Sequence, residues 1–306
     1  MCGYLTEGGL CYIIIMYTFD RYGGKKFRRL NMEQTKKSAL AAKAAQIRLD
    51  ILEEVHAAKS GHPGGSLSIT DVMTYLYFEE MNIDPANPQW ADRDRLVLSK
   101  GHTAPALYAT LAERGYFDTA ELKKLRKIDS FLQGHPDMKH TPGVDMTTGS
   151  LGLGISAACG MALAAKIDGK DYRTYTIVGD GESEEGQVWE ACMFAAHYKL
   201  DNLCVIIDWN GLQIDGAITD VMNPTPHDKK LEAFGFNVVV ANAHDFDELE
   251  AAFNNAKACK GKPTAIIVKS VKGKGVSFME NQASWHGTAP NDEQYAQAVA
   301  EIKATM

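Results

Sequence analysis

The sequence predicts an α/β fold with a mostly parallel sheet and helices on both of its faces. Short apolar segments rich in Val, Ile and Leu alternate along the chain with longer segments of helical periodicity. Such alternation is typical of a parallel sheet enclosed by helices. The 306 residues contain no internal repeat and no linker rich in Pro and Ser. We therefore expect one α/β domain with elaborated loops rather than two smaller domains.

The first half of the chain is predicted to be mainly helical. Over residues 33–58, apolar side chains recur at helical spacing among charged residues and alanines. A glycine-rich turn at residues 60–65 precedes a second expected helix over residues 68–80, with Ser68 as its N-cap. The following stretch is expected to contain a short strand, two helices and a long loop region, at residues 95–99, 104–114, 119–126 and 129–154.

The second half alternates regularly between strands and helices. Apolar runs with many β-branched residues predict strands at residues 172–178, 203–208, 237–240 and 264–269. Amphipathic segments predict helices at residues 184–198, 247–258 and 292–305. Each strand is followed by enough residues for a helical crossover, so the strands are expected to run parallel.

Gly179-Asp180-Gly181 directly follows one of these strands, at the edge where open parallel sheets bind ligands. Taken alone, this tripeptide is a common surface turn. One helix and one strand separate it from Asn210, which therefore returns to the same edge and faces Asp180. Carboxylate and amide oxygens suit Mg²⁺ or Ca²⁺, and the glycines let a diphosphate approach backbone amides.

This pattern resembles the thiamine-diphosphate motif, in which Gly-Asp-Gly is followed by Asn after one helix and one strand. The resemblance implies a thiamine-diphosphate-binding fold of the diphosphate-domain type over residues 32–306. It also implies that Asp180, Asn210 and the main-chain carbonyl of Leu212 hold Mg²⁺, for which Ca²⁺ or Mn²⁺ can substitute. Gly181 would approach the diphosphate of thiamine diphosphate through its backbone.

Other loops resemble those of transketolases, and they occur in transketolase order. The similar segments carry four glycine-flanked histidines and two further glycine-rich loops: Ser60-Gly-His-Pro-Gly-Gly65, Leu98-Ser-Lys-Gly-His102, Gly134-His135-Pro136, Gly149-Ser-Leu-Gly-Leu-Gly154, Val271-Lys-Gly-Lys-Gly275 and Trp285-His286-Gly287. A lone histidine is more often an ordinary surface or core residue. Four in matching loops indicate a site, and the resemblance extends over residues 37–287.

The transketolase resemblance implies a role for each of these residues. His102 and His286 would lie near the diphosphate, whereas His62, His135 and His286 would line the substrate channel and contact sugar hydroxyls. Imidazole suits both tasks, because it can donate hydrogen bonds and move protons near neutral pH. The remaining expected roles are backbone contacts to the pyrimidine from Gly152 and Leu153, packing of Ile214 on the thiazolium, and interface carboxylates at Glu185 and Glu190. Ordinary solvated acids remain an alternative for these two glutamates.

Transketolases continue for about two further domains, whereas this sequence ends at Met306. The resemblance therefore implies the N-terminal subunit of a split transketolase. A separate C-terminal subunit would carry the pyrimidine domain and its activating glutamate, in an α2β2 assembly. The expected reaction (EC 2.2.1.-, with 2.2.1.1 preferred) transfers a two-carbon ketol unit between sugar phosphates of the pentose phosphate pathway.

Two alternatives remain open. The first is a split transketolase-like enzyme for an unusual branched or sulfonated sugar phosphate. The second is a non-catalytic subunit that only binds the cofactor. The four-histidine loops disfavour a deoxyxylulose-phosphate synthase or an α-ketoacid dehydrogenase subunit.

Composition restricts the partners and the compartment. The net charge is −7 and no long basic run occurs, so nucleic acid is not an expected partner. The apolar stretch at residues 10–19 is too short to span a bilayer, so no membrane association is expected. The six cysteines form no Cys-x-x-Cys pair. Reduced, buried thiols in a cytoplasmic protein are expected.

Residues 1–31 differ from the rest and are predicted to be a non-native or disordered extension. We hypothesise that Arg28-Arg29-Leu30-Asn31-Met32 is a translated ribosome-binding site. AGG-AGG encodes Arg-Arg, and two codons then separate it from an ATG. Met32 would be the natural start, which purine-rich codons at Arg28 and Arg29 would support.

Overall fold

The computed structural model describes Thr18, Phe19, Lys25, Lys26 and residues 32–306. The chain divides into two units, Met1–Asn31 and Met32–Met306. The described part of the first unit is an antiparallel pair of two-residue strands, β1 (Thr18–Phe19) and β2 (Lys25–Lys26). The other residues of the predicted N-terminal extension, including the hypothesised ribosome-binding site before Met32, lie outside the described residues.

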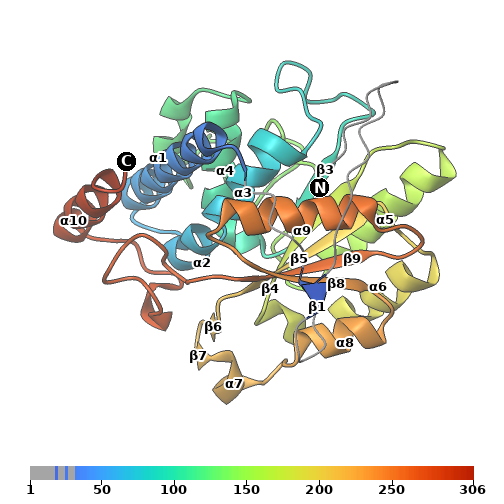
Figure 1. Cartoon of the computed structure of the whole chain (residues 1–306). Helices are drawn as coiled ribbons and strands as arrows, with labels where there is room; N and C mark the ends of the chain where they lie inside the picture. Colours follow the sequence, from blue (N-terminus) through green and yellow to red (C-terminus); the bar gives the residue numbers. More distant parts are fainter. Residues whose placement is uncertain (1–17, 20–24, 27–31) are drawn as a thin grey trace, which may run out of the picture. The chain divides into compact units, whose positions relative to one another are not determined.

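The second unit is built on a five-stranded sheet with strand order β3-β4-β5-β9-β8 (Figure 1). Every neighbouring pair of strands in this sheet is parallel, which confirms the predicted fold class. Its strands are β3 (Arg95–Leu98), β4 (Thr174–Gly179), β5 (Leu203–Trp209), β8 (Asn237–Asn242) and β9 (Thr264–Lys269).

The central strands are buried on both faces. In β5, Cys204 and Ile206 belong to the apolar core on one face, while Val205 and Ile207 belong to the core on the other. This division follows from the period of two along a strand. Because neither face meets water, the strand sequence is continuously apolar rather than alternating with polar residues.

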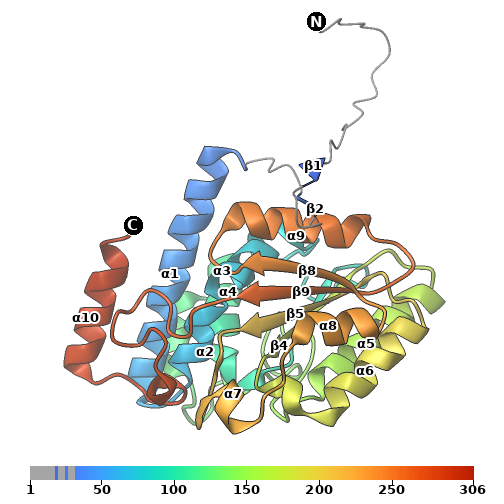
Figure 2. The same cartoon turned by 60° about the horizontal axis from the view of Figure 1, so that its bottom comes forward.

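Helices cover both faces, as Figure 2 shows. The helices of the first face are α1 (Gln34–Ala58), α3 (Thr70–Tyr75), α4 (Ala104–Arg114) and α9 (Phe246–Ala258). The helices of the second face are α5 (Gly154–Ile167), α6 (Gly186–His197) and α8 (His227–Ala233). None of the helices among the described residues combines the length and the hydropathy that a membrane-spanning segment requires.

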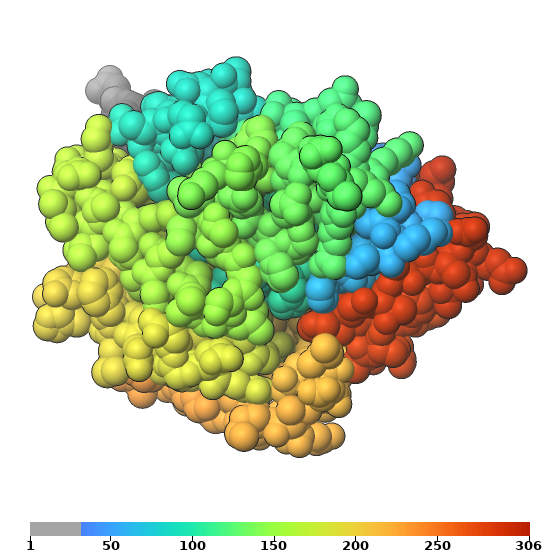
Figure 3. Space-filling model, turned by 180° about the vertical axis from the view of Figure 1, so that it is seen from behind, coloured from blue at the N-terminus to red at the C-terminus, as the bar shows by residue number. Residues whose placement is uncertain are grey.

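Shorter elements complete the unit. They are α2 (Pro63–Ser68), a π-helical turn (Leu76–Glu80), four 3-10 turns (Gly101–Thr103, Thr119–Lys124, Glu182–Glu184 and Ala283–Trp285), a small hairpin of β6 (Leu212–Gln213) and β7 (Gly216–Ala217), α7 (Ile218–Val221) and the C-terminal α10 (Asp292–Lys303). Helix α10 packs on α1. Figure 3 shows the C-terminal segment in red beside the blue of α1, which lies next to the green loop region.

Several predicted boundaries were wrong. Ser68 is the last residue of α2 rather than an N-cap. Its hydroxyl instead donates to the carbonyl of Gly65 at 2.9 Å and to Asp208 Oδ2 at 2.8 Å. Helix α5 was not predicted at all, because its alanine-rich sequence has no clear polar face. The helix expected over residues 119–126 is a 3-10 turn that ends at Lys124.

Glu54 is a buried acid whose carboxyl group has no hydrogen-bond partner among the described residues. It lies on α1 with 0% exposure, and neither carboxyl oxygen has a hydrogen-bond partner among the described residues. Burial, together with the nearby Asp50 carboxylate, holds the pKa of Glu54 well above its usual range. The folded chain therefore retains the Glu54 proton to a higher pH than the unfolded chain does.

We expect Glu54→Leu to raise the free energy of unfolding by about 1–3 kcal/mol, because burial of an unpaired polar group is costly. The unfolded chain releases the Glu54 proton above its ordinary pKa, whereas the folded chain retains it. Wild-type stability should therefore fall as the pH rises above that value, by up to about 1.4 kcal/mol per pH unit. Urea unfolding at pH 5 and pH 8 measures the difference.

Glu54→Gln is the matched control, because it retains a buried polar group but cannot ionise. The free energy of unfolding of Glu54→Gln should vary with pH as that of Glu54→Leu does, but it should be lower at every pH. Identical pH dependence in wild type and the leucine variant would contradict a raised pKa for the buried Glu54.

Candidate functional site

A cavity of about 370 Å³ lies at the carboxyl edge of the sheet. The segments that follow β3, β4, β5 and β9 meet there with the start of α2. Parallel strands end at this edge, so polar residues distant in sequence are brought together. Its lining includes His62, Lys100, His102, Asp180, Gly181, Asn210, Leu212, Ile214, Lys272 and His286.

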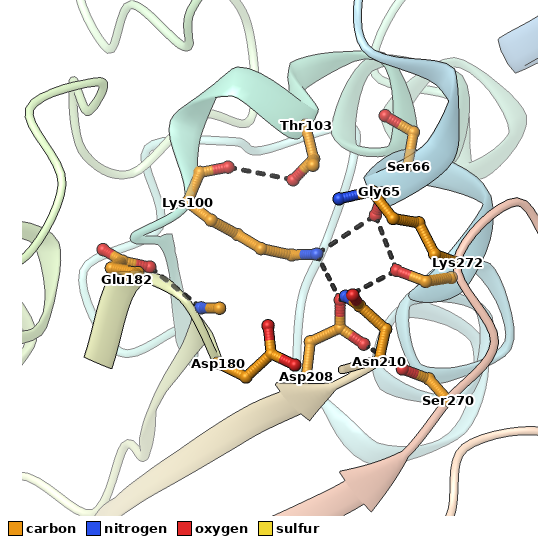
Figure 4. A network of polar contacts seen from close by, with 12 residues as sticks. Gly65, Ser66, Lys100, Thr103, Asp180, Glu182, Asp208, Asn210, Ser270 and Lys272 are labelled. Carbon is orange, nitrogen blue, oxygen red and sulfur yellow. Dashed lines mark hydrogen bonds and ion pairs between the residues drawn. The ribbon is translucent and has the colours of Figure 1, made fainter. Parts of the chain in front are cut away.

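The structure brings Asp180 and Asn210 to the tips of neighbouring strands. Strands β4 and β5 pair in parallel with Gly179 opposite Asp208, and Asp180 and Asn210 follow these positions (Figure 4). The carboxylate of Asp180 accepts hydrogen bonds from the amides of Gly181 at 2.9 Å and Gly211 at 2.5 Å. Burial, with the nearby Asp208 carboxylate, raises the pKa of Asp180 to about 7. A cation beside Asp180 would favour its ionised form.

A buried ion pair supports this edge of the sheet. Lys100 Nζ lies 2.5 Å from Asp208 Oδ2 and 3.1 Å from the carbonyl of Gly65. Asp208 also accepts hydrogen bonds from Ser68, Ser270 and Asn210. Burial alone would raise the pKa of Asp208, but the Lys100 ammonium and the hydroxyls of Ser270 and Ser68 hold it below its usual value. Lys100 is therefore tied into the network drawn in Figure 4.

Lys272 is the second cation of the cavity, and no sequence motif had assigned it a role. Its ammonium group donates to the carbonyl of Leu212 at 3.0 Å and contacts Nδ1 of His286 at 2.9 Å. The residue is 2% exposed. Burial and the charge of Lys100 lower the pKa of Lys272 to about 8. The sequence signals for this lysine were its place in the transketolase-like segment Val271-Lys-Gly-Lys-Gly275 and its position just beyond the carboxyl end of a predicted strand.

Three of the four predicted histidines meet in the cavity. The ring centroid of His62 lies 5.2 Å from that of His102 and 5.4 Å from that of His286, and His102 and His286 are 5.0 Å apart. Burial lowers the pKa of His62 to about 4 and that of His286 to about 3, with Lys272 contributing to both. Burial also holds the pKa of His102 well below its usual value. All three are neutral near pH 7.

His135 is not part of this cluster. It lines a neighbouring hollow of about 580 Å³ together with other residues of the loop region. Gly149, which lines the first cavity, also lies against His135, because a Cβ atom on Gly149 would come within 3.0 Å of the imidazole ring. The two hollows are therefore adjacent at Gly149.

Of the other predicted contact residues, some line the cavity and others do not. Ile214 and Glu185 line the first cavity, but Gly152 and Leu153 are not among its lining residues. The amide of Gly152 already donates to Glu182 Oε1 at 2.9 Å, and the side chain of Leu153 is 53% exposed. Glu190 lies exposed on α6.

Glu182 was missed in the sequence, although it directly follows the Gly-Asp-Gly turn. It is buried and accepts hydrogen bonds from Ser99 Oγ at 2.5 Å, from the amide of Gly152 and from the amide of Gly179 at 2.9 Å. It therefore joins the loop after β3, the loop before α5 and the end of β4. A carboxylate directly after the turn was the signal that could have identified it.

The oxygen donors at the cavity fit a hard divalent cation bound together with a phosphorylated ligand. Among the described residues, no group of three or more His, Cys, Asp and Glu side chains could hold a metal. A cation here would instead use one carboxylate (Asp180), one amide oxygen (Asn210) and one main-chain carbonyl (Leu212), with ligand phosphates completing its shell. Nδ1 of His62 is also buried without a hydrogen-bond partner among the described residues, as expected of a group that faces a ligand.

Comparison with known families identifies the domain. Residues 39–304 match the family described as the thiamine diphosphate binding domain of transketolase. The chain belongs to the transketolase family. Thiamine diphosphate is the cofactor for which this family domain is named, in agreement with the prediction.

Two transketolase subunits are similar to most of the chain. A 6-deoxy-6-sulfo-D-fructose transketolase subunit of Clostridium sp. (strain MSTE9) is 48% identical and matches 86% of this chain and 96% of its own length. An apulose-4-phosphate transketolase subunit of Phocaeicola vulgatus is 43% identical and matches 82% of this chain and 89% of its own length. The predicted resemblance to the N-terminal part of a split transketolase is confirmed.

Solved transketolases share the fold. The transketolase of Leishmania mexicana superposes with a TM-score of 0.81 and is 36% identical over 86% of this chain. This match covers 41% of that transketolase chain. The chain thus spans about two fifths of the length of the solved transketolase that it resembles.

Proposed function

We propose that this chain is the diphosphate-binding subunit of a split transketolase, which transfers a two-carbon ketol unit from a ketose to an aldose. The observation that carries the proposal is the meeting of Asp180, Asn210 and three neutral histidines in one cavity at the carboxyl edge of a parallel sheet. The length relationship supports it, because the two similar subunits are matched over 96% and 89% of their own length.

In this proposal, Asp180, Asn210 and the Leu212 carbonyl bind Mg²⁺, for which Ca²⁺ or Mn²⁺ can substitute. Gly181 offers close backbone approach to the diphosphate. His102, His286 and Lys272 lie in the same cavity and would donate hydrogen bonds to the diphosphate oxygens. When bound, thiamine diphosphate supplies the nucleophilic carbon, while the chain's own residues orient the reactants and shield them from water.

Neutral imidazoles suit the sugar side of the cavity. Because burial holds the pKa of His62 and His286 low, each ring carries one donor and one acceptor near neutral pH. Such groups bind hydroxyls without attracting anions indiscriminately, and they can accept a proton transiently. We assign contacts with sugar hydroxyls to His62, His286 and, from the adjacent hollow, His135.

The partner would complete the site. Among the described residues, the lining of the cavity includes no arginine, but Arg126 lies near enough to His62 and His135 to lower the pKa of both. We assign the distal anionic group of the sugar to a second chain, as the resemblance to transketolases implies. That C-terminal subunit would carry the pyrimidine domain, in an α2β2 assembly. The relatives named for 6-deoxy-6-sulfo-D-fructose and apulose 4-phosphate make sulfonated and branched sugars candidates beside the common sugar phosphates.

Co-expression with the pyrimidine-domain subunit from the same genome tests the proposal. We expect ketol transfer to ribose 5-phosphate by the pair, with Mg²⁺ and thiamine diphosphate, and none by either chain alone. Xylulose 5-phosphate, 6-deoxy-6-sulfofructose and apulose 4-phosphate are compared as donors. Chelation of the metal should stop the reaction. Turnover by this chain alone would refute the shared site, and a pair without transfer from any ketose would refute the function.

A further inference from the structure

His244 joins two distant parts of the chain just outside the cavity. It follows β8, and its Nδ1 lies 2.7 Å from Asp71 Oδ2 on α3. On the opposite side of the ring, Nε2 accepts a hydrogen bond from the amide of Val271 at 3.0 Å. The side chain of His244 is 13% exposed and that of Asp71 is 9% exposed.

The partners determine the tautomer of His244. A backbone amide can only donate, so Nε2 must carry a lone pair and Nδ1 must carry the proton that points to Asp71. Asp71 is also held by Arg48, whose Nη2 lies 2.6 Å from the same Oδ2 atom. Burial alone would raise the pKa of Asp71, but Arg48 and the His244 hydrogen bond hold it well below its usual range. The carboxylate is thus a stable acceptor that fixes the ring.

The amide that His244 binds belongs to the residue directly before Lys272. Beyond Lys272, the amide of Gly273 donates to the carbonyl of Gly64, and the carbonyl of Lys272 accepts from the amide of Asn281, both at 2.9 Å. The backbone is therefore fixed on both sides of Lys272. On the strand side, side chains hold the segment at two successive residues: the hydroxyl of Ser270 donates to Asp208, and the amide of Val271 donates to His244.

We propose that His244 is a positioning residue for cofactor binding, which acts by holding the Val271 amide and thereby keeping the Lys272 ammonium in the cavity. The inference rests on the proposed function, because the ligand that Lys272 meets there is the diphosphate of thiamine diphosphate. A lysine has many rotamers, and burying its charge is unfavourable. A fixed backbone reduces this penalty before the ligand arrives, which strengthens binding.

Two substitutions separate the two hydrogen bonds of the ring. The amide of asparagine reaches the position of Nδ1, so His244→Asn keeps the contact with Asp71 and loses the contact with Val271. The amide of glutamine reaches the position of Nε2, so His244→Gln can still accept from Val271 but loses the contact with Asp71. Each variant loses one hydrogen bond, so the two form a matched pair.

The test is a calorimetric titration of thiamine diphosphate, with saturating Mg²⁺, into the full chain co-purified with its partner subunit. We expect His244→Asn to weaken binding by about tenfold, the effect of losing one net hydrogen bond. His244→Gln should stay within about threefold of wild type. Equal losses in both variants, or a larger loss for glutamine, would overturn the inference.

A double-mutant cycle with Lys272→Met tests whether His244 acts through Lys272. If it does, adding His244→Asn to Lys272→Met should change cofactor affinity by less than about twofold. A full tenfold loss in both backgrounds would assign His244 a general structural role and refute the inference. Failure of the wild-type complex to bind thiamine diphosphate would instead refute the proposed function, so the two failures are distinguishable.

Discussion

Asp180→Ala is expected to abolish ketol transfer by the assembled enzyme and to weaken Mg²⁺-dependent binding of thiamine diphosphate by more than about 100-fold. Even residues that only support metal ligands typically contribute 10–100-fold to metal affinity, and Asp180 is the one carboxylate in the proposed ligand set. Its side chain is held in place by the amides of Gly181 and Gly211. Calorimetric titration and a coupled transfer assay measure the two losses.

The same substitution should leave the cofactor-free chain folded and about as stable as wild type. The reason is that burial and Asp208 raise the pKa of Asp180 to about 7, so the empty site holds an acid in unfavourable surroundings. Removing that acid should offset the two lost hydrogen bonds to within about 1 kcal/mol. Asp180→Asn, which keeps the shape but not the charge, should also be inactive. A fully active asparagine variant would contradict metal binding by this carboxylate.

The parallel strands and the positions of Asp180 and Asn210 could be predicted from sequence for one physical reason. Neighbouring parallel strands end at the same edge, so residues directly after β4 and β5 must lie close together. The sequence alone shows that one helix and one strand separate Asp180 from Asn210, so no tertiary contact needs to be known. The cluster of His62, His102 and His286 could be predicted only through resemblance, because no periodic pattern relates their loops.

Hydrogen bonds between segments far apart in sequence could not be predicted where the order of the strands does not bring the two segments together. Lys272 reaches the carbonyl of Leu212, and His244 joins Asp71 to Val271, but none of these pairs has a local signature. Ser68 shows the same limit for boundaries: a serine before an apolar run indicates an N-cap, yet here its hydroxyl donates to Asp208 across the fold. A hydrogen bond to a distant residue therefore takes the place of the N-cap role that was predicted for Ser68.

Lys100→Met is expected to destabilise the chain by about 3–5 kcal/mol, the usual effect of removing one partner from a buried ion pair. The side chains of Lys100 and Asp208 are 3% and 0% exposed, and their charged atoms lie 2.5 Å apart. Without the ammonium, Asp208 would retain three hydrogen-bond donors, and the nearest remaining positive charge would be the more distant Lys272. Urea unfolding of the cofactor-free chain at neutral pH measures the loss.

The double variant Lys100→Met/Asp208→Asn is the matched control, because it removes both charges. We expect it to recover most of the lost stability, since replacing a buried ion pair by uncharged groups often changes stability little.

The pH dependence of stability provides a second check. Because the pKa of Asp208 lies below its usual value, its stabilisation is present at neutral pH and is lost as the pH falls through the folded-state pKa. In Lys100→Met that stabilisation should be absent at neutral pH. A cost below about 1 kcal/mol would indicate an effectively solvated pair, as at a protein surface, and would contradict the burial of this network.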